Sequence, residues 1–175
     1  MKKTIFLAGG CFWGTQKYMD QIKGVCETEV GFANGNTVNP SYEEVCHNNT
    51  GHAETVRVIY DDAVLSLPQL LRFYFRSINP TSLNRQGEDK GSQYRTGIYY
   101  TDPQEEAVIR EELTELAKNY DKPIMVECLP LKNYYPAEEY HQKYLEKNPN
   151  GYCHLSEHLF ATTGNDRIFS HKENV

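Results

Sequence analysis

The stretch "TIFLAGGCFWG", residues 4–14, predicts a strand, a tight turn and the start of a helix in one short run. The first residues are mostly apolar, as in a strand, and Gly9-Gly10 permits a tight turn. Apolar residues then recur at mixed helical spacing: Phe12, Trp13, Tyr18, Met19 and Ile22. A helix is therefore expected to begin near Cys11.

Cys11 would lie at the N-terminus of that helix. Free amide groups and the helix dipole favour a thiolate at this position, and a thiolate is a nucleophile. The alternative is a buried cysteine that packs as a small hydrophobe, and the local sequence leaves both open. The adjacent Phe12 and Trp13 would point about 100° apart on a helix. At least one of them is expected to line a pocket beside the sulfur, although both could belong to the core.

The rest of the chain alternates strands with helices. Strands are expected over 24–35, 53–61, 96–101 and 123–129, and helices over 66–78, 102–120 and 136–148. Ser66 is expected to cap its helix, and Asp102 is expected to cap the next one, with Pro103 in the first position. The order predicts a two-layer α+β domain with helices packed on a mixed sheet. Two long polar loops, 36–52 and 79–95, are of a length that is often functional.

Composition excludes several classes of protein. A chain of 175 residues fits one domain, and no apolar run is long enough to span a bilayer. The net charge of −6 and the lack of a basic patch argue against a nucleic-acid partner. The first residues combine two lysines with a short apolar run, which is interpreted as a strand and not as a signal peptide. No membrane partner is expected.

The chain has five cysteines, an odd count at wide spacing: Cys11, Cys26, Cys46, Cys128 and Cys153. This pattern is a poor disulfide framework, and no pair has the C-x-x-C spacing of a zinc knuckle. We expect no metal, no cofactor and a reducing, cytoplasmic compartment, where a disulfide would be transient and catalytic. No ligand spacing supports zinc at His52 and His141, and His141 is expected to orient a neighbour near the site.

"GCFWG" resembles the signature of the A-class peptide methionine sulfoxide reductases. Further blocks that resemble this family follow in its order over about residues 4–153: "NPSYEEVC", "GHAETVRV", "NPTSLNRQGEDKGSQYR", "YPAEEYHQKYLEKNP" and "GYC". The resemblance implies an oxidoreductase that reduces methionine-S-sulfoxide, free or in proteins, and so repairs oxidised proteins. It also implies a ferredoxin-like α/β roll with long active-site loops, a catalytic domain over 1–153 and a coil-rich tail over 154–175.

The chemistry of a sulfoxide calls for two groups. A thiolate can attack the electron-poor sulfur, but the oxygen must be protonated, so the site also needs a neutral acid and hydrogen-bond donors. By the resemblance, Cys11 is the nucleophile and Glu54 is the acid. A carboxyl that is kept partly dry has a raised pKa and stays protonated near neutral pH. The alternative for Glu54 is an outward-facing strand residue.

The resemblance carries further roles onto this sequence. Tyr42 and Tyr94 would donate hydrogen bonds to the sulfoxide oxygen, since each phenol has one donor. Asp89 would support this oxygen-binding network. Phe12 and Trp13 would hold the terminal methyl group of the substrate in an apolar pocket.

The resemblance also assigns the resolving cysteine. After oxygen transfer Cys11 would carry a sulfenic acid, which condenses with a second thiol to a disulfide. Cys153, in "GYCH", matches that second thiol, and its glycine-flanked position suits a mobile tail. No cysteine follows it, so the disulfide would be presented to an external reductant, in this family usually thioredoxin. Cys26, Cys46 and Cys128 are interpreted as core or bystander thiols.

Two other functions stay open on the sequence. One is a different thiol enzyme, peroxide-reducing or disulfide-exchanging, that uses the same Cys11 and Cys153. The other is a non-catalytic domain that binds methionine through the aromatic pocket. A peroxidase has no evident need for Glu54 together with two tyrosines, and a binding domain has no need for Cys153.

Overall fold

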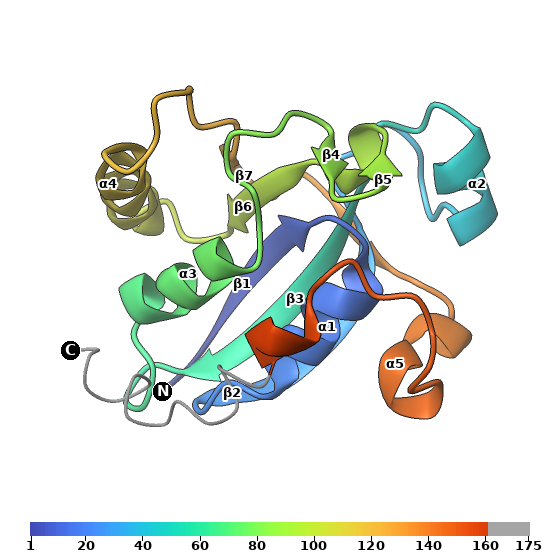
Figure 1. The fold of residues 1–175 in the computed structure, drawn as a ribbon, viewed down its shortest axis with the longest axis horizontal. Helices are drawn as coiled ribbons and strands as arrows, with labels where there is room; N and C mark the ends of the chain where they lie inside the picture. The colour runs from blue at the N-terminus through green and yellow to red at the C-terminus, as the bar shows by residue number, and fades with distance from the viewer. Residues whose placement is uncertain (161–175) are drawn as a thin grey trace.

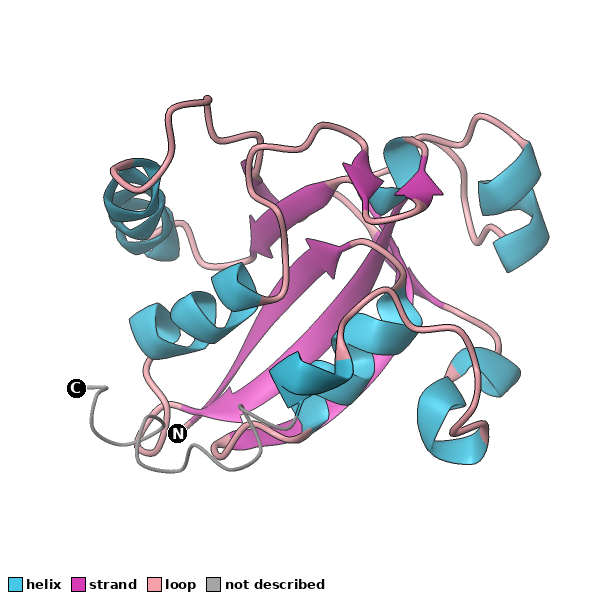
Figure 2. Ribbon diagram, in the orientation of Figure 1, coloured by secondary structure: helices cyan, strands magenta, loops and turns pink. Residues whose placement is uncertain are grey.

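The computed structural model describes residues 1–160 and is built around a six-stranded sheet with the order β7-β6-β1-β3-β2-β8 (Figures 1 and 2). The strands are β1 (Lys2–Gly9), β2 (Val25–Ala33), β3 (Ala53–Asp61), β6 (Thr96–Tyr100), β7 (Glu127–Pro130) and β8 (Tyr134–Pro136). Only β6 and β7 pair in parallel, and the other neighbours are antiparallel. The mixed sheet confirms the expected α+β class.

Three helices share one core with the sheet: α1 (Phe12–Asp20), α3 (Leu67–Arg76) and α4 (Glu105–Ala117). Helix α1 packs over β2 and β3 and runs roughly along these strands, as Figure 1 shows. The core between these layers contains Ile5 of β1, Val56 of β3 and Leu70 of α3, none of which is exposed. Ser66 caps α3 as predicted, because its side chain accepts from the backbone N–H of Gln69 in a reciprocal capping box.

The predicted strand–turn–helix run is confirmed. β1 ends at Gly9, and Gly10 takes a positive φ of 91°, a conformation that glycine adopts without the strain of a Cβ. Cys11 follows as the N-cap residue of α1. β1, one of the two central strands, therefore leads directly to Cys11 at the start of α1.

Both long loops contain short ordered pieces. The first holds α2 (Tyr42–His47), which Ser41 caps with a second capping box. The second holds β4 (Arg85–Gln86), β5 (Asp89–Lys90) and the 3-10 turn η1 (Ser92–Tyr94). In Figure 1 β4 and β5 lie close to the end of β1 that carries Cys11.

The predicted helix over 136–148 is wrong, since the chain forms a 3-10 turn η2 (Glu139–His141) and a short α5 (Tyr144–Lys147). Lys143 separates them in the left-handed region, with φ 56°. Its Nζ donates to Asp20 Oδ2 at 2.7 Å, and the side chain of Gln142 bonds both backbone groups of Val30 at 2.9 Å. Contacts with α1 and β2 therefore replace helical hydrogen bonds that the local sequence favours.

Two further boundaries differ from the prediction. Helix α4 begins at Glu105, with Gln104 as N-cap, so it starts later than predicted; Asp102 Oδ1 nevertheless accepts from the Gln104 N–H at 3.0 Å across Pro103. The strand expected over 123–129 is confined to β7, and β8 was not predicted. Among the described residues, no helix has the length and apolar character needed to cross a membrane.

Part of the expected C-terminal tail is visible. Residues 157–160 are helical, and Leu155, Leu159 and Phe160 pack against the core. The remainder of the tail, 161–175, lies outside the described residues. The domain boundary after residue 153 stays a prediction.

We expect Tyr74→Phe to lower the free energy of unfolding by about 1–3 kcal/mol, because it leaves buried backbone groups without their partner. The Tyr74 hydroxyl is fully buried, donates to Ala8 O at 2.6 Å and accepts from Gly97 N at 3.1 Å, so it ties α3 to β1 and β6. Urea unfolding measures the change. Tyr120→Phe, at an exposed tyrosine, is the control and should stay within about 0.5 kcal/mol of wild type. Equal losses in both variants would contradict the argument.

Candidate active site

Cys11 lies at the junction of β1 and α1, where the helix begins. Its side chain is only 6% exposed. The backbone N–H groups of Trp13 and Gly14 face the sulfur and lower its pKa, as a helix N-terminus should. The sulfur therefore has donors that would stabilise it once it carries charge.

Burial nevertheless dominates the ionisation of Cys11. It raises the pKa of the thiol well above its ordinary value, and a charge on Glu54 would raise it further. The N–H groups of the helix start favour the thiolate, as predicted, but burial, which the sequence does not show, outweighs them.

Glu54 stands at the start of β3 and is 1% exposed, so it does not face outward. Its Oε1 accepts a hydrogen bond from the backbone N–H of Phe12 at 3.1 Å. Its Oε2 is buried and has no hydrogen-bond partner among the described residues. Burial raises the pKa of Glu54 to about 8, the Phe12 N–H opposes the shift, and the charge of Asp89 adds to it. At neutral pH the carboxyl is protonated and one oxygen remains available.

The two long loops bring Tyr42 and Tyr94 to the same place. Burial is the main cause of the raised pKa of each phenol, and a charge on Glu54 is the second cause for both. A charge on Cys11 also raises the pKa of Tyr94. Both hydroxyls are therefore protonated and lie within electrostatic range of the carboxyl.

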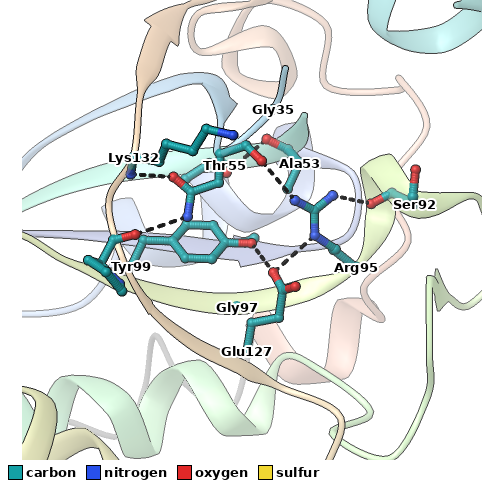
Figure 3. Close-up of polar contacts among 12 residues, drawn as sticks. Gly35, Ala53, Thr55, Ser92, Arg95, Gly97, Tyr99, Glu127 and Lys132 are labelled. Carbon is teal, nitrogen blue, oxygen red and sulfur yellow. Dashed lines mark hydrogen bonds and ion pairs between the residues drawn. The ribbon is translucent and has the colours of Figure 1, made fainter. Parts of the chain in front are cut away.

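Arg95 fixes the loop that carries Tyr94 (Figure 3). Its guanidinium donates to Glu127 Oε1 of β7 at 3.0 Å and to the carbonyl of Ser92 at 2.9 Å. Tyr99 donates to the same Glu127 oxygen at 2.6 Å. These bonds hold the turn before β6 against β7, the edge strand of the sheet.

Asp89 acts through charge and through one hydrogen bond. Its Oδ2 accepts from the hydroxyl of Tyr152 at 2.9 Å, and its charge raises the pKa values of Glu54 and Cys11. Tyr152 therefore links the second loop to the segment that contains Cys153. Tyr152 was not predicted, and its only signal in the sequence is its place beside a cysteine in "GYC".

Trp13 forms a half-buried aromatic wall. Its indole stacks on Tyr144 with ring centroids 3.8 Å apart and an angle of 12°, and its Nε1 donates to His141 Nδ1 at 3.0 Å. Burial lowers the pKa of His141, so the ring is neutral and Nδ1 is free to accept. The prediction that His141 orients a neighbour is confirmed, whereas Tyr144 was not predicted.

Phe12 has both structural and site contacts. It is 1% exposed, and its ring lies 5.5 Å from that of Phe32 in the core and 6.2 Å from that of Tyr42. The Tyr42 ring in turn lies 4.3 Å from His141. The aromatic rings therefore form one continuous surface next to Glu54.

Cys153 lies against the start of α1, not in a distant tail. A Cβ built on Gly14 would be 3.0 Å from Cys153 Sγ, so the two residues are in contact. Burial raises the pKa of this thiol as well. All five cysteines are free thiols.

The remaining cysteines differ from one another. Cys128 is buried, as expected of a core thiol, but Cys26 is exposed. Cys46 is half-buried in α2, not in a strand, and a charge on Glu54 would raise its pKa, so it lies near the site. His52 is not arranged as a ligand, since its Nε2 bonds the carbonyl of Thr37 at 2.8 Å. No group of three potential metal ligands occurs within residues 1–160.

Comparison with known proteins gives a consistent result. A family model described as peptide methionine sulfoxide reductase matches residues 3–173. A relative from Lachnoclostridium phytofermentans, described as peptide methionine sulfoxide reductase MsrA, is 59% identical over 165 residues, which cover 94% of this chain and 99% of the relative.

Solved structures are also similar. Mxr1 from Saccharomyces cerevisiae in reduced form has a TM-score of 0.84 and 37% identity, covering 89% of this chain and 91% of that one. Mxr1 in complex with Trx2 has a TM-score of 0.59 and 26% identity, covering 82% and 84%.

The raised pKa of Glu54 predicts a stability difference that depends on pH. Between the ordinary value of 4.5 and about 8 only the folded state keeps the proton, so wild-type stability falls as pH rises, by up to about 1.4 kcal/mol per pH unit. Glu54→Gln has no proton to lose, so its stability relative to wild type should increase as the pH rises from 4.5 to about 8. Urea unfolding of both proteins at pH 5 and pH 8 measures it.

The exposed Glu115→Gln is the matched control and should follow wild type at both pH values. If the stability of Glu54→Gln also changes in parallel with wild type, the carboxyl is not held protonated by burial.

Proposed function

The chain belongs to the peptide methionine sulfoxide reductase family and is an oxidoreductase that reduces methionine sulfoxide; we propose that it acts on the S epimer, free or in proteins, through Cys11 and Glu54. The observation that carries the proposal is the pairing of a buried thiol with a buried, protonated carboxyl across the first turn of α1. Nucleophile and acid are the two groups that a sulfoxide requires.

In the first step Cys11 attacks the sulfoxide sulfur while Glu54 gives its proton to the oxygen. The unpartnered Oε2 is the free position of this carboxyl, and Tyr42 and Tyr94 supply donors in the same space. The oxygen moves to Cys11, the thiol proton restores Glu54, and the sulfide leaves. The products are methionine and a Cys11 sulfenic acid, so atoms and charge balance.

The substrate is held by contacts away from the oxygen. Trp13 presents a half-buried apolar face, which suits the methyl group of the substrate, and the buried Phe12 backs the site through its contact with the ring of Tyr42. The stack on Tyr144 and the hydrogen bond to His141 keep the indole in one orientation. Asp89 supports the oxygen-binding network through its charge.

In the second step Cys153 attacks the Cys11 sulfenic acid, which releases water and forms a disulfide. The contact of Cys153 with Gly14 keeps this sulfur near the helix start. We further propose a thioredoxin-like protein as the reductant, since Mxr1 has been solved in complex with Trx2. Such a cycle fits the reducing, cytoplasmic compartment that the cysteine pattern predicts and would repair oxidised proteins there.

The S epimer should be consumed and the R epimer left. When the methyl group faces Trp13 and the oxygen faces Glu54, only one handedness at sulfur can also point its open side at Cys11. Chiral analysis of racemic methionine sulfoxide after exhaustive reaction with dithiothreitol measures this. Consumption of both epimers at similar rates would show that the site does not fix the methyl group, the oxygen and the open side of the sulfur at the same time.

The two proposed redox sulfurs should behave differently on substitution. Cys11→Ser should abolish reduction, because no sulfur remains to accept the oxygen. Cys153→Ser should release one equivalent of methionine per enzyme and then stall with thioredoxin, leaving a sulfenic acid on Cys11. Product counting and trapping of the sulfenic acid measure both. Cys26→Ser is the control and should turn over like wild type. Full thioredoxin-dependent turnover by Cys153→Ser would mean that another thiol resolves the intermediate.

A further inference from the structure

The imidazole of His154 lies across the turn that carries Cys11. Its Nε2 is 3.0 Å from the carbonyl of Gly9. A Cβ on Gly10 would be 3.1 Å from Nε2, and a Cβ on Gly14 would be 3.0 Å from Nδ1. The two glycines that flank the "CFW" motif therefore leave the space that this ring fills.

The hydrogen bond to Gly9 determines which ring nitrogen carries the proton. A carbonyl can only accept, so in the neutral ring Nε2 donates and Nδ1 keeps its lone pair. Nδ1 is buried and has no hydrogen-bond partner within residues 1–160. Burial lowers the pKa of His154, so the ring is neutral at physiological pH. Nδ1 is therefore a proton acceptor to which no group of residues 1–160 donates.

The thiol of Cys153 is a candidate donor for that acceptor. Its sulfur and His154 Nδ1 are both 3.0 Å from the Cβ position of Gly14, which places the two atoms within twice that distance of each other. Burial raises the pKa of the Cys153 thiol, so this sulfur needs a base before it can attack. Catalytic hydrogen bonds are often long in free enzymes and shorten when the reacting groups meet.

We propose that His154 is the base that accepts the thiol proton of Cys153 when this sulfur attacks the Cys11 sulfenic acid, an inference that rests on the function proposed above. The S–H bond of Cys153 and the S–O bond of Cys11 break, and the S–S bond forms. Cys153 is oxidised and the sulfenic sulfur is reduced. The departing hydroxide takes a proton from Glu54 to give water, and the proton on Nδ1 returns to that carboxylate through solvent.

Other charged groups surround His154. The charge of Asp89 on β5 raises its pKa, opposing burial. Arg76 of α3 and His158 line a cavity of about 370 Å³ together with His154. Lys17 of α1 acts on the neighbouring sulfur, where its charge lowers the pKa of Cys153. The cavity gives the ring a route for proton exchange, and Lys17 favours the thiolate that the base creates.

The test compares His154→Gln with wild type in a single turnover without reductant. The amide nitrogen of glutamine takes the place of Nε2 and can still donate to the carbonyl of Gly9, but glutamine is no base. Released methionine reports the first step and should be unchanged, which also shows that the proposed function holds. The disulfide, followed by acid quench and peptide mapping, should form about 100-fold more slowly at pH 7. The difference in rate between variant and wild type should become smaller as the pH rises toward the pKa of the Cys153 thiol, because a thiolate needs no base.

Two further variants separate a base from a structural contact. His154→Gly should recover disulfide formation when imidazole is added, whereas His47→Asn, at an exposed histidine of α2, should match wild type throughout. If disulfide formation is slowed equally at every pH and imidazole does not restore it, the proposal is overturned, because the ring would then only hold the segment in place. Loss of the methionine burst in a folded His154→Gln would overturn it too, since His154 would then act on Cys11.

Discussion

The site depends on how the first backbone N–H groups of α1 are shared. The Phe12 N–H binds Glu54 Oε1, while the Trp13 and Gly14 N–H groups face the sulfur of Cys11. A helix start has only a few such unpaired donors, and here they serve the acid and the nucleophile together. The backbone of one turn therefore sets the position of the carboxyl relative to the thiol. The β1–α1 junction must be rigid for this arrangement, and the sheet holds it through the antiparallel neighbours of β1 on both sides.

Burial has opposite consequences for the two groups. It raises the pKa of Glu54 into the range where an acid must lie to be protonated at neutral pH, which helps the reaction. It also raises the pKa of Cys11, which hinders attack. The conflict is reduced if both protons move in one step, because neither a buried carboxylate nor a buried thiolate then stands alone. In the proposed reaction, the N–H groups of the helix and the phenols of Tyr42 and Tyr94 are hydrogen-bond donors for the charge that develops during that step.

The sequence predicts the elements that depend on local signals. The run through Cys11 and the capping box at Ser66 follow from adjacent residues, and both are confirmed. The helix over 136–148 fails because Gln142 and Lys143 bind β2 and α1, more than a hundred positions away in the chain. Long separation along the chain also hides Tyr144, whose partner is Trp13, and Tyr152, which lies 63 positions from its partner Asp89. Family motifs point to the residues proposed for the chemistry, but they do not show how deeply Cys11 is buried, which is the main cause of its raised pKa.

Glycine on both sides of the cysteine motif now has a structural reason. Gly10 and Gly14 leave room for residues 153–154, so the segment that carries the second thiol can lie directly on the turn that carries the first. Any side chain at Gly14 would press on Cys153 and His154 together. The same contact bears on the proposed disulfide. That bond would join the turn that carries Cys11 to the segment that carries Cys153, and the hydrogen bond between His154 Nε2 and the carbonyl of Gly9, 3.0 Å long, already ties the two together.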